Sequence, residues 1–273
     1  MKKINLKIIL SFLITSLLFV GFTVKAEKLD DIIKSGTLKC GVMLDFPPAG
    51  FRDKNNNPIG YDVEYCKDIA KSMGVKAVIV ETASPQRLPA IISGQVDISI
   101  GSVTSTIERS KTVLFTNHYL VYKLTAMVKK GSSIKVWDDL AGKKVGVVLG
   151  TTPEIEYLKN CKAWSQGCKQ VSYKSNADQM LAFKQGKVDA VIDASSIIGF
   201  MVNGAEGKDY QVGPVVPNFN DWISIAVPKG EYHLREFLDT HIFWTVDSGR
   251  YAELYKKWFG GKAPALVRSD VNF

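Results

Sequence analysis

A serine, a threonine and an arginine stand close together in a pattern that suits the binding of a carboxylate. Ser102 and Thr104 follow an apolar run, and Arg109 lies five residues beyond Thr104. Arginine holds a carboxylate through two parallel hydrogen bonds from its planar guanidinium. Ser105 and Glu108 fit a capping box, which predicts that Arg109 lies in the first turn of a helix, where the dipole attracts anions. Arg109 is the strongest candidate for a ligand contact, and a solvated arginine beside Glu108 is the alternative.

The segment Gly150-Thr151-Thr152 has a similar character further along the chain. It follows an apolar run and precedes a segment with helical spacing. A glycine turn at the start of a helix presents backbone N–H groups and hydroxyls, and this arrangement suits the binding of an anion. For the hydroxyls of Ser102 and Thr104, the alternative is to cap the turn that follows the apolar run.

Strand-like runs alternate with helical patterns along the chain, which predicts an α/β fold with largely parallel sheets. A polar break at residues 129–133 divides the chain into two halves, and the same order of elements starts again after it. The predicted strands are residues 38–44, 77–81, 96–100, 144–149, 188–192 and 222–227. The predicted helices are residues 61–73, 87–93, 153–159, 177–185, 234–247 and 250–259.

Two short internal repeats indicate that the halves are lobes with a shared topology. Residues 41–48 match residues 146–153 at four of eight positions, and residues 94–100 resemble residues 186–192. The end of the chain has the pattern of a return to the first lobe. The expected parts are a first lobe over residues 27–125, a second lobe over residues 126–221 and the return over residues 222–273.

Two extended segments, at about residues 119–128 and 221–227, are the expected connections between the lobes. Two such strands form a hinge that allows the lobes to close around a ligand. Because ligands bind beyond the carboxyl ends of the strands in open parallel sheets, we expect the turns after the strands to converge on one cleft. These turns contain Asp45 with Phe46, Ser102 with Thr104, Thr151 with Thr152, and Asp193 with Ala194.

The first 26 residues have the pattern of a cleaved secretory signal. Lys2, Lys3 and Lys7 precede an apolar run at residues 8–22, and small residues follow at the two positions that a signal peptidase reads. An uncleaved membrane anchor is the alternative, but an anchor needs about 20 apolar residues. We therefore expect a soluble protein in the periplasm.

The charge of the chain argues against a nucleic-acid binder. Four lysines and no acids lie in the first 26 residues, so the remaining chain carries 31 basic and 27 acidic residues, a net charge of +4. These charges are spread along the sequence, whereas a nucleic-acid binder gathers Lys and Arg in a stripe with aromatic residues between them. The three histidines are isolated and no cysteine has a histidine nearby, so we expect no metal and no organic cofactor.

Four cysteines in an exported protein predict disulfides. Cys161 and Cys168 flank a polar segment of six residues, and we expect them to close a surface loop. Cys40 lies in a predicted strand, and Cys66 lies on the apolar stripe of a predicted helix. These two either pair across a strand–helix contact or are two small buried hydrophobic residues, and the sequence leaves both interpretations open.

Several short motifs occur in a specific order and spacing. They are Gly60-Tyr61-Asp62 and the segments 41–51, 87–97, 102–111, 142–147, 150–152 and 254–260. On these motifs the chain resembles the polar-amino-acid family of extracellular solute-binding proteins, the receptors of ABC importers. The resemblance implies a periplasmic-binding-protein fold, a small amino acid or related carboxylate trapped between two lobes, an ABC permease as partner, and a monomer. The alternatives are an enzyme on the same fold, a dehydratase acting on a cyclic carboxylate, and a sensory protein.

The resemblance also implies roles for the candidate residues. In the family, the residue that matches Arg109 binds the α-carboxylate of the ligand. The residues that match Thr151 and Thr152 meet the same carboxylate from the second lobe, and those that match Ser102 and Thr104 hydrogen-bond the ligand. The ligand is therefore expected to be held by both lobes at once.

Two further positions bear on the identity of the ligand. Phe46 resembles the aromatic wall that stacks on the ligand in this family, although it is otherwise a candidate for the core. Arg87 corresponds to a position that often reaches the side-chain carboxylate in receptors for acidic amino acids. Because an unpaired buried cation is costly, a second arginine in the cleft favours an acidic amino acid.

One position departs from the family pattern. The aspartate that usually holds the α-ammonium of the ligand is replaced by Ala194, and Asp193 stands one residue earlier. Neighbouring residues of a strand point to opposite faces, so Asp193 reaches the cleft only if the strand ends there. Otherwise the ligand need not carry an α-amino group. The enzyme alternative would then depend on Asp193 or Asp45 as an acid or base.

Overall fold

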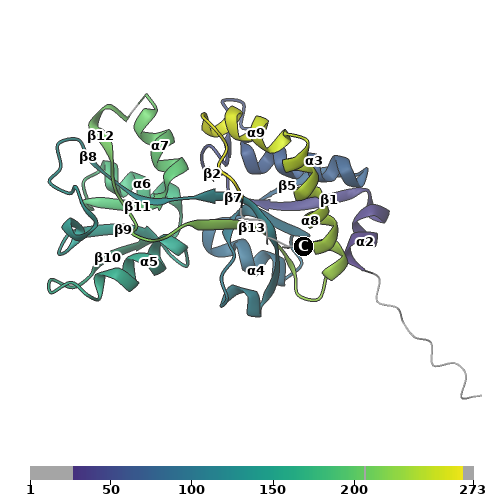
Figure 1. Cartoon of the computed structure of the whole chain (residues 1–273), viewed down its shortest axis with the longest axis horizontal. Coiled ribbons are helices and arrows are strands. Elements are labelled where there is room, and N and C mark those ends of the chain that lie inside the picture. The colour runs from purple at the N-terminus through teal and green to yellow at the C-terminus, as the bar shows by residue number, and fades with distance from the viewer. Residues whose placement is uncertain (1–26, 206, 267–273) are drawn as a thin grey trace, which may run out of the picture.

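The computed structural model describes residues 27–205 and 207–266. These residues form two lobes that lie side by side and are joined by two extended connections (Figure 1). The predicted signal peptide, residues 1–26, and the last part of the predicted return, residues 267–273, lie outside the described residues. Within the described residues, no helix has the length and hydrophobicity needed to cross a membrane.

Lobe 1 is built on five strands, which are β1 (Thr37–Val42), β5 (Lys76–Glu81), β6 (Ile98–Thr104), β7 (Val113–Tyr122) and β13 (Asp221–Pro228). Their order in the sheet is β5-β1-β6-β13-β7. β1 runs parallel to β5 and β6, whereas β13 runs antiparallel to β6 and β7. β6 is buried along its whole length, as expected of a central strand covered on both faces.

Lobe 2 repeats this plan with β8 (Leu124–Lys129), β9 (Lys144–Val148), β10 (Lys169–Tyr173), β11 (Ala190–Ala194) and β12 (Tyr210–Val215). The order is β10-β9-β11-β8-β12, with two parallel pairings followed by two antiparallel ones. The predicted two-lobed α/β fold is therefore confirmed. Both sheets are mixed rather than mostly parallel, because the strands that join the lobes pair in the antiparallel sense.

The helices cover the two sheets. In lobe 1, the apolar stripe of the predicted helix over residues 61–73 is buried, and Gly74 ends the helix with a φ of 70°, which a residue with a side chain rarely adopts. A small antiparallel sheet lies beside it, formed by β2 (Asp45–Phe46), β3 (Gly50–Arg52) and β4 (Pro58–Ile59). The helices of lobe 1 are α2 (Lys28–Ser35), α3 (Tyr61–Met73), α4 (Arg87–Ile92), α8 (Tyr232–Asp247) and α9 (Arg250–Phe259). Those of lobe 2 are α5 (Thr152–Cys161), α6 (Asn176–Lys184) and α7 (Ser195–Asn203), and the 3₁₀ turns are η2 (Ser84–Gln86), η3 (Arg109–Lys111), η4 (Trp137–Leu140) and η5 (Gly207–Asp209).

The chain crosses between the sheets twice. Lys123 alone separates β7 from β8, and residues 216–220 separate β12 from β13. The first crossing lies within the predicted segment 119–128. The second crossing precedes the predicted segment 221–227, because β13 belongs to the sheet of lobe 1 from its first residue, Asp221, onward.

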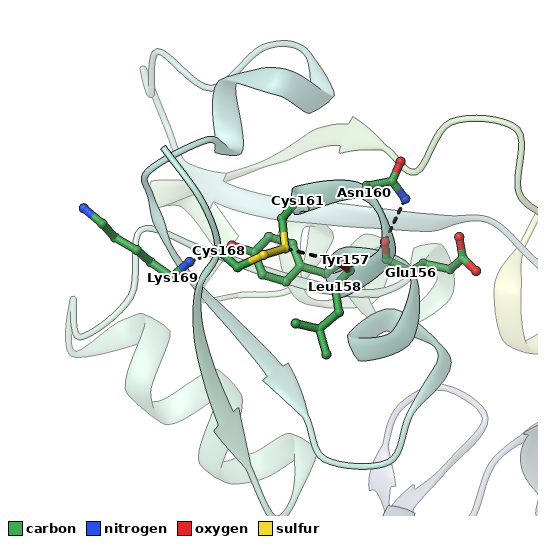
Figure 2. Close-up of a disulfide and its surroundings, with 7 residues drawn as sticks. All are labelled: Glu156, Tyr157, Leu158, Asn160, Cys161, Cys168 and Lys169. Carbon is green, nitrogen blue, oxygen red and sulfur yellow. Dashed lines mark hydrogen bonds between the residues drawn. A yellow bond between two sulfur atoms is a disulfide. The ribbon is translucent and has the colours of Figure 1, made fainter. Parts of the chain in front are cut away.

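Each lobe contains one disulfide. Cys40 on β1 is bonded to Cys66 on α3, and both residues are fully buried, so the first of the two open interpretations is confirmed. The predicted bond between Cys161 and Cys168 joins the end of α5 to the segment before β10. Figure 2 shows this bond beside the ring of Tyr157, whose hydroxyl accepts a hydrogen bond from the Lys169 N–H at 3.3 Å.

Candidate ligand-binding site

Several hydrogen bonds join the facing edges of the two lobes where the predicted residues meet. The Thr104 and Thr152 hydroxyls lie 2.6 Å apart. Arg109 donates from Nη2 to the Gly150 carbonyl at 2.9 Å, and Asp45 accepts from the Asn176 N–H at 2.9 Å. The turns of both lobes therefore face one another, as the sequence predicted from the carboxyl ends of the strands.

Thr104 lies at the centre of a short chain of hydrogen bonds. Its hydroxyl donates to Oδ1 of Asp221 at 2.6 Å. A hydroxyl carries one proton, so the Thr152 hydroxyl is the donor in the bond between the two threonines. Burial raises the pKa of Asp221 to about 6, although the Thr104 hydroxyl and the Arg109 guanidinium oppose this shift. Asp221 is therefore linked to Thr152 of lobe 2 through the Thr104 hydroxyl.

Arg109 reaches across the cleft, but no helix supports it. Its Nη1 donates to the Thr104 carbonyl at 2.9 Å, and its backbone N–H donates to the Thr106 hydroxyl at 3.2 Å. The predicted helix with Ser105 as its cap is wrong, because η3 spans only three residues before β7 begins at Val113. The helix dipole contributes nothing here. The predicted grip on an anion rests on the guanidinium alone, whose pKa burial lowers and the Asp221 carboxylate raises.

Thr151 caps the helix that begins beside it. Its hydroxyl donates to the Val148 carbonyl at 2.6 Å and accepts from the Glu154 N–H. The carboxylate of Glu154 in turn accepts from the Gly150 N–H at 2.7 Å. These bonds hold the turn before α5 in place, so Thr151 has a capping role that the sequence did not predict. Its contact with a ligand stays a prediction, as does that of Thr152.

Ser102 belongs to a buried network on the lobe 1 side. Its hydroxyl donates to Asp62 at 3.0 Å and lies 3.3 Å from the Tyr122 hydroxyl. The Tyr119 hydroxyl also donates to Asp62, at 2.8 Å. Burial raises the pKa of Asp62 to about 7, against these two hydrogen bonds. Ser102 also has a φ of 52°, which is uncommon for a residue with a side chain and often marks a functional segment.

Phe46 and Arg87 support the cleft from lobe 1. Phe46 is buried, and its ring meets that of Tyr122 edge-on, with centroids 6.4 Å apart. Arg87 is also buried, and its guanidinium donates to three backbone carbonyls, those of Ser84, Gly101 and Ser102, at 2.7–3.0 Å. These bonds fix the backbone of the Ser102 turn. A direct contact of Arg87 with a ligand stays a prediction.

Asp193 lies close to the end of β11, whose last residue is Ala194. It is buried, and one carboxylate oxygen accepts from the Ala194 N–H at 2.8 Å. Burial raises its pKa to about 7; that N–H and the positive charge of Arg87 oppose the shift, whereas Asp45 and Asp221 add to it. Arg87, Asp45 and Asp221 belong to lobe 1, so Asp193 of lobe 2 faces the cleft.

Asp45 already has partners in the other lobe. One of its oxygens accepts from the Asn176 N–H and, at 3.4 Å, from the Ala177 N–H, which are the first two residues of α6. Such orphan N–H groups at the start of a helix attract a carboxylate. The contact joins the lobes, and a role for Asp45 in binding the ligand stays a prediction.

The comparison with known protein families decides the affiliation. The protein-family model described as bacterial extracellular solute-binding proteins, family 3, matches residues 38–261 of the chain. The chain belongs to this family.

Among relatives in family 3, the L-cystine-binding protein TcyJ of Escherichia coli (strain K12) is 29% identical over 249 residues, which cover 89% of this chain and 91% of that protein. The structure is similar to that of the cysteine-binding protein of Campylobacter jejuni, with a TM-score of 0.80, 28% identity, and coverage of 89% of this chain and 97% of that one. It is also similar to an ancestral arginine-binding protein bound to arginine, with a TM-score of 0.77, 35% identity, and coverage of 82% and 99%. These are binding proteins, which confirms the prediction of a solute-binding protein rather than an enzyme.

Three polar residues of this candidate ligand-binding site were not predicted from the sequence. Asp221 stands directly before an apolar strand, and Asp62 stands inside the apolar pattern of α3. Tyr122 is the last residue of β7, where the first crossing begins. A charged or polar residue at the boundary of a buried element was the available signal. Within residues 27–205 and 207–266, no group of three or more His, Cys, Asp or Glu side chains is placed to hold a metal ion.

Proposed function

We propose that this family 3 protein captures a neutral or cationic α-amino acid in the cleft between its lobes. It works in the periplasm as a monomer and delivers the amino acid to the permease of an ABC importer. The known relatives support an amino acid as ligand, since they are named for L-cystine, cysteine and arginine.

The balance of charge around the cleft carries the proposal. Two arginines, Arg87 and Arg109, interact electrostatically with Asp221, and Asp193 interacts with Arg87, Asp45 and Asp221. With Asp62, which interacts with Arg87, four carboxylates therefore share the site with two guanidiniums. An acidic amino acid brings two carboxylates and one ammonium, so it would add a net negative charge where carboxylates already outnumber guanidiniums, which is costly. A neutral amino acid adds no net charge, and a cationic one offsets one carboxylate.

The preference for an acidic amino acid rests on Arg87 as a free second cation. Its Nε and Nη1 already donate to backbone carbonyls, which supports a structural role for this side chain. Arg109 then remains as the partner of the ligand α-carboxylate. A small rotation of its guanidinium away from the Gly150 carbonyl would free Nη2 for that contact.

Asp193 is the proposed partner of the α-ammonium. Only one of its oxygens accepts a hydrogen bond from the described residues, that from the Ala194 N–H. An ammonium near the other oxygen would favour the ionised carboxylate and would lower its pKa from about 7. Asp193 would in this way take the role of the family aspartate that Ala194 replaces.

A thermal-shift screen of the ligand-free mature protein tests the proposal. L-arginine, L-cysteine and L-glutamine represent the expected class, L-glutamate the acidic class, and 2-oxoglutarate a carboxylate without the amine. A ligand at about 1,000 times its dissociation constant stabilises by about 4 kcal/mol. We expect this response from a member of the first group. A stronger response to glutamate would reassign Arg87 to the ligand, and a response to 2-oxoglutarate alone would refute the amino acid.

A further inference from the structure

A cavity lies between the lobes beside the residues that are expected to face the amino acid, and Tyr122 belongs to both. It has a volume of about 360 Å³ and is lined by residues near the ends of α7 and α9 and of β7. α7 belongs to lobe 2 and α9 to lobe 1, and the two helices lie at the top of Figure 1 on facing sides of the gap between the lobes. Neither Arg109 nor any of the four candidate serines and threonines lines this cavity.

Aromatic rings make up most of its apolar wall. Tyr122, Tyr255, Trp258 and Phe259 come from lobe 1, and Phe200 comes from lobe 2. The rings hold one another in place: Phe259 lies 5.0 Å from Tyr255 and 6.0 Å from Tyr122, measured between centroids. At the rim, the ring of Phe51 packs against both Phe200 and Trp258. The walls are therefore preformed, as in most sites for small molecules.

The lining contains no charged side chain. Its polar groups are hydroxyls and an amide, including those of Ser195, Ser196 and Asn203 on α7. The Ser195 hydroxyl accepts from the Lys123 N–H at 3.3 Å, which leaves its own proton free to donate. A charged molecule would lose its hydration here without a partner, whereas a neutral one would need only a hydrogen bond or two.

We propose that this cavity is a second binding site, for a small neutral aromatic molecule with a hydrogen-bonding group. An apolar cavity of about 150 Å³ is enough to hold benzene, so a bicyclic ring fits a cavity of about 360 Å³. Because both lobes line the site, an occupant holds them in the arrangement in which Thr104 also meets Thr152. The occupant and the amino acid therefore strengthen each other's binding.

Indole is the probe, because it is bicyclic, neutral and carries one N–H donor. Isothermal titration or ligand-observed NMR on the mature protein is expected to detect indole binding, and indole-3-carboxylate is expected to bind at least about tenfold more weakly. Absence of indole binding at millimolar concentration would overturn the proposal. Equal binding of the carboxylate would overturn the neutral class of ligand.

Gly199 offers a variant that fills the cavity. It lines the site on α7, and a Cβ atom added at this position meets no heavy atom within 4 Å. Leucine is also a better helix former than glycine, so Gly199→Leu is expected to fold. It should weaken indole binding by about tenfold or more, whereas the matched variant Gly199→Ala should bind indole nearly as well as the parent. Unchanged binding in Gly199→Leu would place indole elsewhere and overturn the assignment.

Arg109→Ala separates this site from the proposed amino-acid site. The variant is expected to lose far more affinity for the amino acid than for indole, because Arg109 does not line the cavity and affects indole only through its bond to Gly150 between the lobes. In the parent protein, a saturating amino acid should raise the affinity for indole. Indole should raise the affinity for the amino acid by the same factor. Competition between the two would mean that indole enters the cleft, and it would overturn the second site. Failure of every amino acid in the screen would leave the indole result intact.

Discussion

The two lobes share one topology but contribute different chemistry to the cleft. Each sheet has two parallel pairings followed by two antiparallel ones. Lobe 1 supplies two arginines, the buried Arg87 and the half-buried Arg109, together with Asp221, whereas lobe 2 supplies the turn with Thr151 and Thr152. A common fold therefore constrains where the site lies, and the residues in the turns decide what it does.

The difference indicates an order of importance for binding. Strong electrostatic contacts come from charged groups in a partly dry site, and neutral hydroxyls contribute less. Lobe 1 should therefore anchor the ligand, and lobe 2 should cover it. Asp193 is the exception, because it is the one buried aspartate of lobe 2 that faces the arginines.

The largest expected effect is the loss of affinity in Arg109→Ala. Removing one partner of a buried charge-assisted pair costs about 2–5 kcal/mol, which is roughly a 30-fold to 4,000-fold rise in Kd. Isothermal titration with the amino acid found in the screen measures this change. Arg52→Ala, which removes an arginine paired with Glu81 on the surface of the same lobe, is the control and should leave Kd unchanged. A comparable loss in both variants would refute lobe 1 as the anchor.

The next effect compares the two disulfides. Cys40 and Cys66 are 26 residues apart, and Cys161 and Cys168 are 7 apart. Loop-closure entropy predicts a loss of about 3.5 kcal/mol in the free energy of unfolding for Cys40→Ala with Cys66→Ala, and about 2.5 kcal/mol for Cys161→Ala with Cys168→Ala. The lobe 1 pair is fully buried, so its replacement also leaves a cavity.

Urea unfolding of the two double variants measures the difference between the disulfides. Unfolding of the parent protein in the presence of a reductant is the control, because it should lower stability at least as far as either double variant. A larger loss from the lobe 2 pair would mean that the stability of the surface loop, and not that of the lobe 1 core, limits the protein.

The sequence predicted helices and strands well where the hydrophobic periodicity is sustained over many residues. The helix over residues 61–73 is found with the predicted bounds, and the strand at residues 77–81 lies within β5. α7 was not predicted, because its sequence is apolar nearly all round and shows no contrast between two faces. The helix at Arg109 failed because a capping signal is local, whereas the start of β7 is fixed by its pairing with β13.

The site was predictable only in part, for a related reason. Turn motifs identified Thr104, Arg109 and Thr152, because each follows a recognisable strand. The partner of Thr104 is Asp221, 117 residues further along the chain, and no local pattern connects them. The contact of Asp45 with the start of α6 spans 131 residues in the same way. Contacts between lobes depend on how the lobes meet, which periodicity does not encode.

The buried aspartates predict opposite pH dependences for stability and binding. The pKa of Asp193 is about 7 in the folded protein against a reference value of 3.8, so the folded state binds more protons than the unfolded chain between these values. Its contribution to stability is present below about pH 4 and is lost as the pH rises through 7. Ligand binding should strengthen over the same rise, because the ammonium needs the ionised carboxylate.

The variant Asp193→Asn tests both pH dependences, that of stability and that of ligand binding. We expect this variant to raise the stability of the ligand-free protein at pH 8 by about 2 kcal/mol or less, and to weaken amino-acid binding there. Thermal unfolding and titration at pH 5 and pH 8 measure these changes. Asp178→Asn, at an exposed position in the same lobe, should alter neither profile. A parent protein that binds more tightly at pH 5 than at pH 8 would contradict the role of Asp193.

The smallest effect compares the two threonines that meet across the cleft. Thr152→Val removes one hydroxyl of lobe 2 and should weaken the binding of the amino acid by about 0.5–1.5 kcal/mol, the usual contribution of one neutral hydrogen bond. Thr104→Val also leaves the buried Asp221 without its donor, so about 1–3 kcal/mol is expected. Both changes nearly conserve volume, which makes each variant the control of the other. If titration gives Thr152→Val the larger loss, lobe 2 is more than a cover and anchors the ligand at least as strongly as lobe 1.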